Sequence, residues 1–260
     1  MPDKGTLKKL TKVEGEGTAS ATAARETKPF VAGDESRGKA KSLRLFAIIS
    51  WIVAIGLEVV AILLLGKPPI NTTWLIVLIV ADLIFAVIGN LLWKKANSFD
   101  PASEKDGFKF FIQNQLGAII SVIAFLPLVI LIFTNKDMKG KQKGLVGAIA
   151  VVALLIAVVT GIDFNPPSVE KYAEQTAQVE ALNNGLNHVF WTKSGKSYHL
   201  YSDCSYINSD RTVEIFAGNV AQARELKNIT DICDRCKNRA AKDKELPAET
   251  TPEVQEEKTE

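Results

Sequence analysis

Three cysteines and one histidine near the C-terminal end of the chain have the spacing of metal ligands. Four residues separate His199 from Cys204, two separate Cys233 from Cys236, and 28 lie between the two pairs. Zinc binds four nitrogen or sulfur ligands at the corners of a tetrahedron, and two separated turns commonly supply two ligands each. The spacing therefore predicts a zinc site formed by His199, Cys204, Cys233 and Cys236.

This set uses all 3 cysteines of the 260-residue chain. An odd number of cysteines in a short stretch argues against a disulfide framework. Two other interpretations stay open: free buried cysteines beside an unrelated histidine, or a redox pair formed by Cys233 and Cys236. The redox motif, however, normally belongs to a thioredoxin-like unit, for which this segment is too short. His188 precedes the first predicted strand and is the poorer histidine candidate. Four protein ligands leave no open coordination position, which predicts a structural metal and no catalytic one.

The elements that must position these ligands are expected to form a small α+β domain over residues 188–240. Residues 189–192 and 197–201 are rich in aromatic and β-branched side chains, with Ser194-Gly195 between them, which predicts a hairpin with His199 on its second strand. A strand at 213–216, a helix at 219–226 and a basic helix after Cys236 follow. So small a domain has little core of its own, so metal binding is expected to supply much of its folding free energy.

The order of these features also carries a family resemblance. An aromatic strand, a turn and a ligand pair are followed by Val213-Glu214-Ile215-Phe216, a helix with Ala221 and Ala223, and Cys233-Asp234-Arg235-Cys236. Residues 188–240 thereby resemble the N-terminal zinc-binding domain of Ada DNA-repair proteins, and more closely the short His-Cys-Cys-Cys modules appended to many bacterial proteins. In Ada the first pair is Cys-x3-Cys and one cysteine accepts a methyl group, whereas His199 occupies that place here. The resemblance implies a metal-stabilised scaffold without methyl transfer.

Four apolar runs precede this domain, at residues 45–66, 73–93, 113–134 and 145–161, and none contains Lys or Arg. A helix needs roughly 20 apolar residues to cross a hydrocarbon layer of about 30 Å. Trp74 and Trp93 lie at the two ends of the second run, where amphipathic rings favour the membrane interfaces. The sequence therefore predicts a membrane all-α protein, in which a four-helix transmembrane bundle (residues 45–161) precedes the small α+β zinc-binding domain.

Lysine and arginine residues beside the runs predict the orientation, because cytoplasmic loops carry an excess of them. Counting charges close to the membrane, nine lie on the side of the two termini and five on the other, where the third loop contributes Lys136, Lys139, Lys141 and Lys143. The nine are Arg37, Lys39, Lys41, Arg44, Lys94, Lys95, Lys105, Lys109 and Lys171. We therefore expect a multi-pass protein of the cell membrane with both termini in the cytoplasm.

Two acidic residues, Glu58 and Asp82, lie inside the first two runs. Carboxyl groups are rare and costly within a membrane. In an antiparallel helix pair both would reach similar depth, where two carboxylates would share a proton or a cation. One interpretation is an intramembrane site for an ion, a proton or a substrate. The other, which the sequence favours, is a protonated carboxyl that holds helices together by bonding to Asn90, Asn114, Gln115 or a backbone carbonyl.

The remaining segments connect or flank these parts. Residues 1–44 hold ten Lys or Arg against six acids, and 241–260 are similarly polar, so both are expected to be disordered tails. Residues 168–187 predict an amphipathic helix next to the membrane, capped by Ser168 and ended by Asn183-Asn184-Gly185. Ala153, Ala157 and Gly161 recur every four residues, a spacing that lets another helix approach closely.

The sequence thus favours a non-enzymatic membrane protein that presents a structural-zinc module to a protein partner, to a second copy of itself or to lipid headgroups. The alternative is a small ion- or proton-coupled transporter that uses Glu58 and Asp82. No nucleophile–base set or phosphate-binding loop supports an enzyme, and no small-molecule substrate is indicated. Nucleic acid is a poor candidate partner, because residues 188–240 hold only eight Lys or Arg against six acids.

Overall fold

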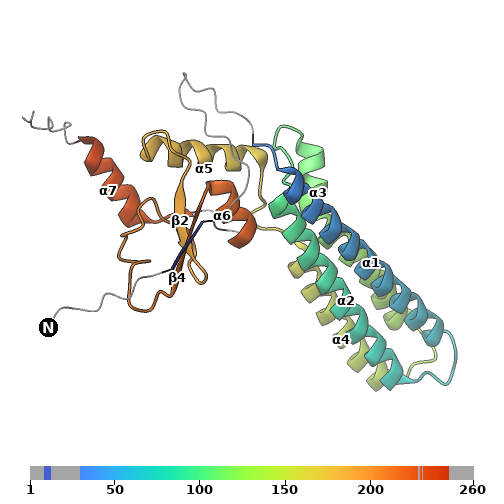
Figure 1. Cartoon of the computed structure of the whole chain (residues 1–260). Helices are drawn as coiled ribbons and strands as arrows, with labels where there is room; N and C mark the ends of the chain where they lie inside the picture. The colour runs from blue at the N-terminus through green and yellow to red at the C-terminus, as the bar shows by residue number, and fades with distance from the viewer. Residues whose placement is uncertain (1–8, 13–29, 228, 230, 246–260) are drawn as a thin grey trace, which may run out of the picture. The chain divides into compact units, whose positions relative to one another are not determined.

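The structure, a computed structural model, describes residues 9–12, 30–227, 229 and 231–245. The chain divides into two compact units, each described by itself below (Figure 1). The helical unit consists of residues 28–173, and the C-terminal unit consists of residues 174–260 together with 1–27.

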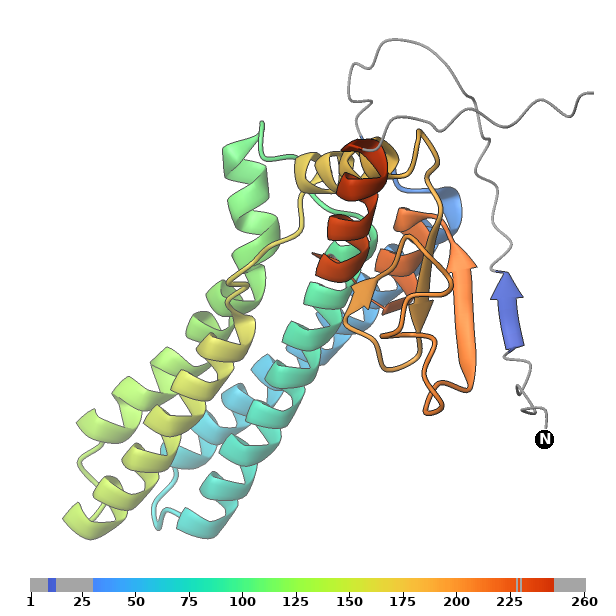
Figure 2. The same cartoon turned by 90° about the vertical axis from the view of Figure 1, so that its left-hand side faces the viewer.

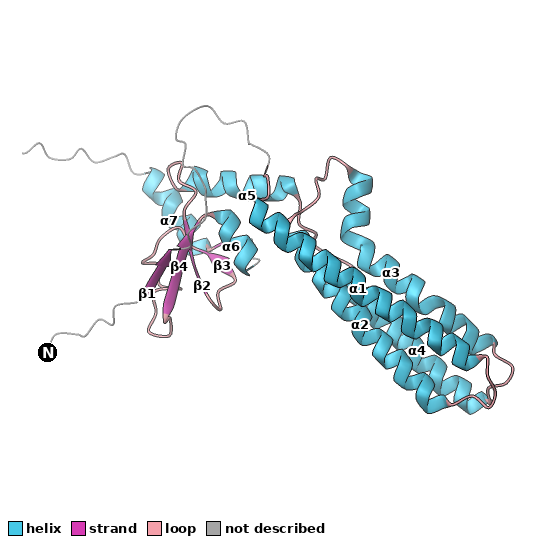
Figure 3. Ribbon diagram, turned by 45° about the vertical axis from the view of Figure 1, so that its right-hand side comes forward, coloured by secondary structure: helices cyan, strands magenta, loops and turns pink. Residues whose placement is uncertain are grey.

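The helical unit is built from four long helices: α1 (Asp34–Leu65), α2 (Thr72–Phe99), α3 (Gly107–Thr134) and α4 (Gly140–Gly161). All four are long enough and apolar enough to cross a membrane. Short loops join them, so consecutive helices run antiparallel and form a bundle (Figure 3). The closest pairs are α1 with α2 and α3 with α4. Each apolar run of the sequence lies within one of these helices, apart from the single glycine that follows α1.

All four helices continue past the predicted spans, and α4 does so by beginning at Gly140. Helix α1 begins at Asp34, α2 ends at Phe99 and α3 begins at Gly107, so the expectation of a disordered tail over residues 1–44 is wrong for residues 34–44. The apolar run measures only the part of a helix that suits hydrocarbon, whereas helical hydrogen bonds continue until a cap or turn ends them. At this end of the bundle the Arg44 guanidinium binds the Asp100 carboxylate at 2.8 Å, which joins the start of α1 to the end of α2.

The outer surface of the bundle is apolar, and its interior combines apolar and polar side chains. Many large apolar side chains point outward and are exposed, for example Leu45, Ile52, Leu63, Ile84, Ile123, Ile130, Leu155 and Val159. The interior contains large apolar side chains such as Leu75, Phe125 and Ile132, many alanines, and buried polar residues, among them Ser50, Glu58, Asp82, Asn90, Asn97, Asn114 and Ser121. A water-soluble domain would cover its outer surface mainly with polar side chains, since large exposed apolar patches are rare in water.

One polar layer joins all four helices. The Trp51 indole N–H of α1 donates to Asn90 Oδ1 of α2 at 3.1 Å. The Asn90 amide in turn donates to Ser121 Oγ of α3 at 3.1 Å and to the Ala157 carbonyl of α4 at 2.9 Å. Because every polar atom of Asn90 is engaged, this layer fixes the register of the helices without leaving an unsatisfied group in the core.

The small-residue face predicted for the fourth run packs against α3. Ala153, Ala157 and Gly161 are all buried. A Cβ atom added to Gly161 would lie 2.4 Å from the Ala118 nitrogen and 2.5 Å from the Gly117 carbonyl carbon. The backbones of α3 and α4 therefore touch at this point, and only glycine fits there.

Helix α5 (Val169–Leu182) follows the bundle and has the ends that the sequence predicts. The Ser168 hydroxyl accepts a hydrogen bond from the Lys171 amide at 3.0 Å, which caps the first turn. Asn184 and Gly185 adopt positive φ angles of 50° and 89°, and the Gly185 amide donates to the Glu180 carbonyl at 2.7 Å. This is the left-handed ending that asparagine and glycine favour.

The C-terminal unit contains two small sheets and two further helices. One sheet has the order β1-β4-β2, in which β2 and β4 are antiparallel, and the other pairs β3 with β5 in parallel. The elements are β1 (Lys9–Lys12), β2 (Val189–Thr192), β3 (Ser197–Tyr198), β4 (Glu214–Gly218), α6 (Val220–Lys227), β5 (Asp231–Ile232) and α7 (Asp234–Glu245). Trp191 on β2 stacks on Phe216 of β4, with ring centroids 6.1 Å apart, over a core that includes the three cysteines.

Strand β1 is an addition that the sequence did not predict, because residues 9–12 lie in the expected disordered tail. It pairs in parallel with β4, from Lys9 opposite Glu214 to Lys12 opposite Ala217 (Figure 2). Four residues with a single apolar side chain carry no strand signal of their own, and the partner edge lies two hundred positions away. Helix α7 also continues into the other expected tail as far as Glu245, and residues 246–260 lie outside the described part of the chain.

Candidate metal centre

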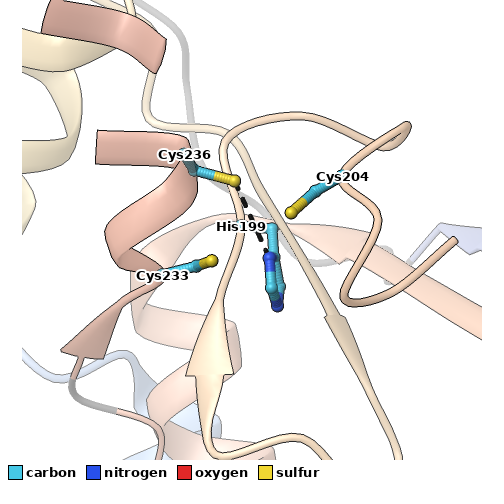
Figure 4. Close-up of side chains that lie close together, drawn as sticks. All are labelled: His199, Cys204, Cys233 and Cys236. Carbon is cyan, nitrogen blue, oxygen red and sulfur yellow. Dashed lines mark hydrogen bonds between the residues drawn. The ribbon is translucent and has the colours of Figure 1, made fainter. Parts of the chain in front are cut away.

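The four predicted ligands come from three separate places in the C-terminal unit (Figure 4). His199 directly follows β3 and is fixed there by two backbone hydrogen bonds with Phe190, both 2.7 Å long. Cys204 lies in the turn after it. Cys233 immediately precedes α7, and Cys236 lies in the first turn of that helix.

These side chains converge on one point. One ring nitrogen of His199 and the three sulfur atoms lie within 4.8 Å of one another, and the Cys236 sulfur is 3.7 Å from His199 Nδ1. In a zinc tetrahedron with Zn–S of about 2.3 Å and Zn–N of about 2.0 Å, the ligand atoms are separated by roughly 3.6–3.8 Å. The group therefore needs only a small contraction to reach coordination distances. All four residues are buried.

Backbone hydrogen bonds hold the ligand-bearing turns in place. The Cys204 carbonyl accepts from the amides of Ile207 at 2.9 Å and Asn208 at 2.7 Å, which closes the turn around this cysteine. The Cys233 amide donates to the Tyr198 carbonyl at 2.9 Å, which ties the start of α7 to β3 and hence to His199. These hydrogen bonds hold the ligand-bearing turns close to one another.

The surroundings of the cluster keep the imidazole neutral and, without an ion, keep the Cys236 thiol protonated. The backbone amides of Leu200 and Tyr201 lie within hydrogen-bonding reach of the Cys236 sulfur, and the positive end of the α7 dipole adjoins it. Burial raises the pKa of the Cys236 thiol well above its usual range, so without an ion the proton stays on sulfur. Burial lowers the pKa of His199 to about 4, which leaves the ring neutral near pH 7 with a lone pair to donate.

What this group can do chemically follows from its composition. Three thiols and one imidazole could hold a metal ion, and together they fill a tetrahedron. A catalytic zinc ion keeps a position open for water or substrate, and four protein ligands leave none. Such a centre crosslinks three chain segments and stabilises the fold.

A second layer of contacts around the centre was not predicted. The Arg239 guanidinium of α7 makes two hydrogen bonds to the Asp203 carboxylate, 2.9 and 3.0 Å long, and lies 4.0 Å above the Tyr201 ring. The Tyr201 hydroxyl donates to Asp243 at 3.0 Å. Helix α7 and the Cys204 turn, which both carry ligands, are thereby clamped together. The only sequence signal for these contacts is the basic character of the helix after Cys236.

The other candidate residues lie elsewhere. His188 is not part of the cluster; its ring lies edge-on to Phe190, with centroids 4.9 Å apart. Glu58 on α1 and Asp82 on α2 are both buried in the helical unit, with 4% and 1% of their surfaces exposed. No family model, no curated protein and no solved structure matches this chain.

Proposed function

We propose that this chain is a non-enzymatic integral membrane protein that presents a zinc-stabilised module next to the membrane. The observation that carries the proposal is the buried group of His199, Cys204, Cys233 and Cys236, whose ligand atoms lie within 4.8 Å of one another in a chain that also has four helices able to cross a membrane. The module serves recognition, and its partner is a protein or a second copy of the chain, held at the membrane surface.

Zinc is the ion that best suits this donor set. A tetrahedral group of three sulfurs and one nitrogen is a common structural zinc site, whereas calcium and magnesium require oxygen ligands. The same donor set supports the resemblance to the His-Cys-Cys-Cys modules of bacterial proteins. A filled coordination sphere supports a structural role and argues against catalysis at the metal.

Membrane insertion is supported by the exposed apolar surface of the bundle together with its polar interior. The pairing of β1 with β4 adds an argument about topology. Strand β1 precedes the first helix of the bundle and β4 follows the fourth, so both must lie on the same side of the membrane. An even number of spans satisfies this condition, and the lysine and arginine distribution favours the cytoplasmic side.

The test of the metal is made on the full chain purified in detergent. Elemental analysis should find one zinc per chain in the wild type and in His188→Ala, and none in Cys233→Ser. His188→Ala is the matched control, because it removes a histidine that lies outside the cluster. A wild-type protein without zinc, or a His188→Ala variant that loses it, contradicts the proposed centre.

Topology is tested separately with Gly140→Cys and Glu245→Cys, in which the native cysteines are kept because their removal should unfold the C-terminal unit. A membrane-impermeant thiol reagent applied to intact cells should label the first position and leave the second unlabelled. Labelling of residue 245 from outside contradicts the proposed orientation.

A further inference from the structure

The two acidic residues of the bundle face each other across the α1–α2 pair. Gly89 of α2 packs directly on the Trp51 ring of α1, since a Cβ atom added there would lie 2.4 Å from the indole nitrogen. Glu58 is seven residues further along α1, and Asp82 is seven residues back along the antiparallel α2. Seven residues are about two helical turns. Glu58 therefore lies on the same face of α1 as Trp51, and Asp82 lies on the same face of α2 as Gly89. Both are displaced in the same direction along the bundle by roughly 10 Å. The two carboxyls are close enough for their charges to interact.

Within the described part of the chain, three of the four carboxyl oxygens lack the hydrogen-bond partners that a packing role requires. Both oxygens of Asp82 and Glu58 Oε1 are buried without a hydrogen-bond partner among the described residues. The amides that the sequence offered as partners are engaged elsewhere. Asn90 bonds within the polar layer, Asn114 donates to the Phe110 carbonyl at 2.9 Å, and Gln115 donates to the Asp163 carbonyl at 3.1 Å. The contacts therefore do not support the interpretation that these acids hold helices together by hydrogen bonds.

No charged side chain compensates them either. Within residues 45–66, 73–93, 110–134 and 144–161, the apolar parts of the four helices, Glu58 and Asp82 are the only titratable side chains. Their neighbours in the core are apolar, including Ala54, Ala61, Ile79 and Ala86. Two carboxylates in such surroundings cannot both stay ionised, because each lacks solvation and each repels the other.

We propose that Glu58 and Asp82 form a proton-binding pair inside the bundle. A proton taken up from water forms an O–H bond on one carboxylate and removes one negative charge, and its release restores that charge. The pair therefore exchanges a proton with the aqueous phase, which goes beyond the anchoring role proposed for the helices.

The surroundings favour a proton over a metal cation. Calcium takes six to eight oxygen ligands and magnesium an octahedral set. Here the two carboxyls are met by alanine and aliphatic side chains and by the backbone amide of Leu128, which faces Glu58 as a donor and cannot bind a cation. A proton needs only one carboxyl oxygen.

The experiment uses the full chain in detergent and a hydrophobic carbodiimide, which reacts with protonated carboxyl groups in apolar surroundings. We expect one reagent molecule per chain, located by mass spectrometry at Glu58 or Asp82, with labelling that falls as the pH rises. Glu35 and Asp137 are exposed acids of the same chain, outside apolar surroundings, and serve as internal controls. Infrared spectra at neutral pH should show a protonated carboxyl band that is absent in the double variant Glu58→Gln with Asp82→Asn.

Three outcomes overturn the proposal. The first is a pair that remains unreactive and shows no protonated carboxyl band in the wild type, a result that does not depend on the folding of any variant. The second is labelling that does not change with pH. The third is protection by added Na⁺, K⁺ or Mg²⁺ at constant pH, which would assign the pair to a metal cation.

Discussion

The metal cluster and the acidic pair are both buried sets of groups that can bind a cation, yet they differ in what surrounds them. At the cluster, four soft donors from three chain segments meet within 4.8 Å, and backbone amides point at a sulfur. At the pair, two carboxyls meet across two helices with apolar neighbours. The first arrangement completes a coordination sphere, and the second cannot.

This difference indicates how each site affects its unit. A complete tetrahedral site stabilises a small domain, because metal binding adds directly to its folding free energy. An incomplete pair contributes nothing of that kind, and burial of its oxygens costs free energy that the rest of the bundle must offset. The cluster should therefore matter most for the stability of the C-terminal unit, whereas the acidic pair should matter for proton exchange.

The largest effect is expected at the cluster. Cys236→Ser and His199→Ala, or removal of zinc by a chelator, should unfold the C-terminal unit. Zinc binding supplies on the order of 10 kcal/mol in finger-like sites, which is comparable to the whole stability of a domain. Limited proteolysis should show rapid cleavage after residue 174 while the four helices stay protected. If the C-terminal unit keeps its protease resistance without metal, the cluster does not stabilise this unit, and the contrast with the acidic pair is lost.

A smaller loss of stability is expected at the polar layer around Asn90, whose groups are all hydrogen-bonded. This layer is the reference against which the acidic pair is compared. Asn90→Ala leaves the Trp51 indole N–H and the Ser121 hydroxyl without the amide between them, which should cost about 1–3 kcal/mol. Thermal unfolding of the helical signal in detergent measures the loss. A neutral result would mean that the layer does not hold the helices in register.

A still smaller effect, of opposite sign, is expected at the pair. Asp82→Leu removes two unsatisfied oxygens and should leave the bundle as stable as the wild type, or more stable by about 1 kcal/mol. The same unfolding measurement on Asp82→Leu and Asn90→Ala compares an unsatisfied polar group with a satisfied one in the same core. Destabilisation of Asp82→Leu by as much as Asn90→Ala would restore the packing interpretation.

The smallest effect is expected at the second histidine. His188→Ala loses an edge-on contact with Phe190, worth at most about 1 kcal/mol, and leaves the metal in place. Zinc retention and unfolding temperature are compared with those of His199→Ala. Equal damage in the two variants would mean that the ligand has been assigned to the wrong histidine.

The sequence predicted the parts that depend on local pattern. The four apolar helices follow from run length, and the helix ends at Ser168 and Gly185 follow from the backbone preferences of those residues. The grouping of His199 with the three cysteines follows from spacing and donor type.

The parts that depend on distant partners could not be predicted. Strand β1 exists only against β4, and the Arg239–Asp203 pair requires knowing that α7 folds back on the Cys204 turn. The hydrogen-bond partners of Asn90 lie on three other helices. The sequence could therefore suggest Asn90 as a partner of Glu58 or Asp82, but it could not show that other residues already bond to it. Spacing within one segment can be read from the sequence, whereas the choice of partner among distant segments cannot.

The parallel pairing of β1 with β4 has a consequence for biosynthesis. Residues 9–12 leave the ribosome before the four helices, whereas their partner, residues 214–218, is made only after them. At about 5–20 residues per second, strand β1 waits on the order of 10–40 s for its partner. During that time the unpaired edge of β1 is open to pairing with other chains, which lysines such as the two that end Lys9–Lys12 discourage. A strand made before the bundle can thus pair only after the whole bundle has been made.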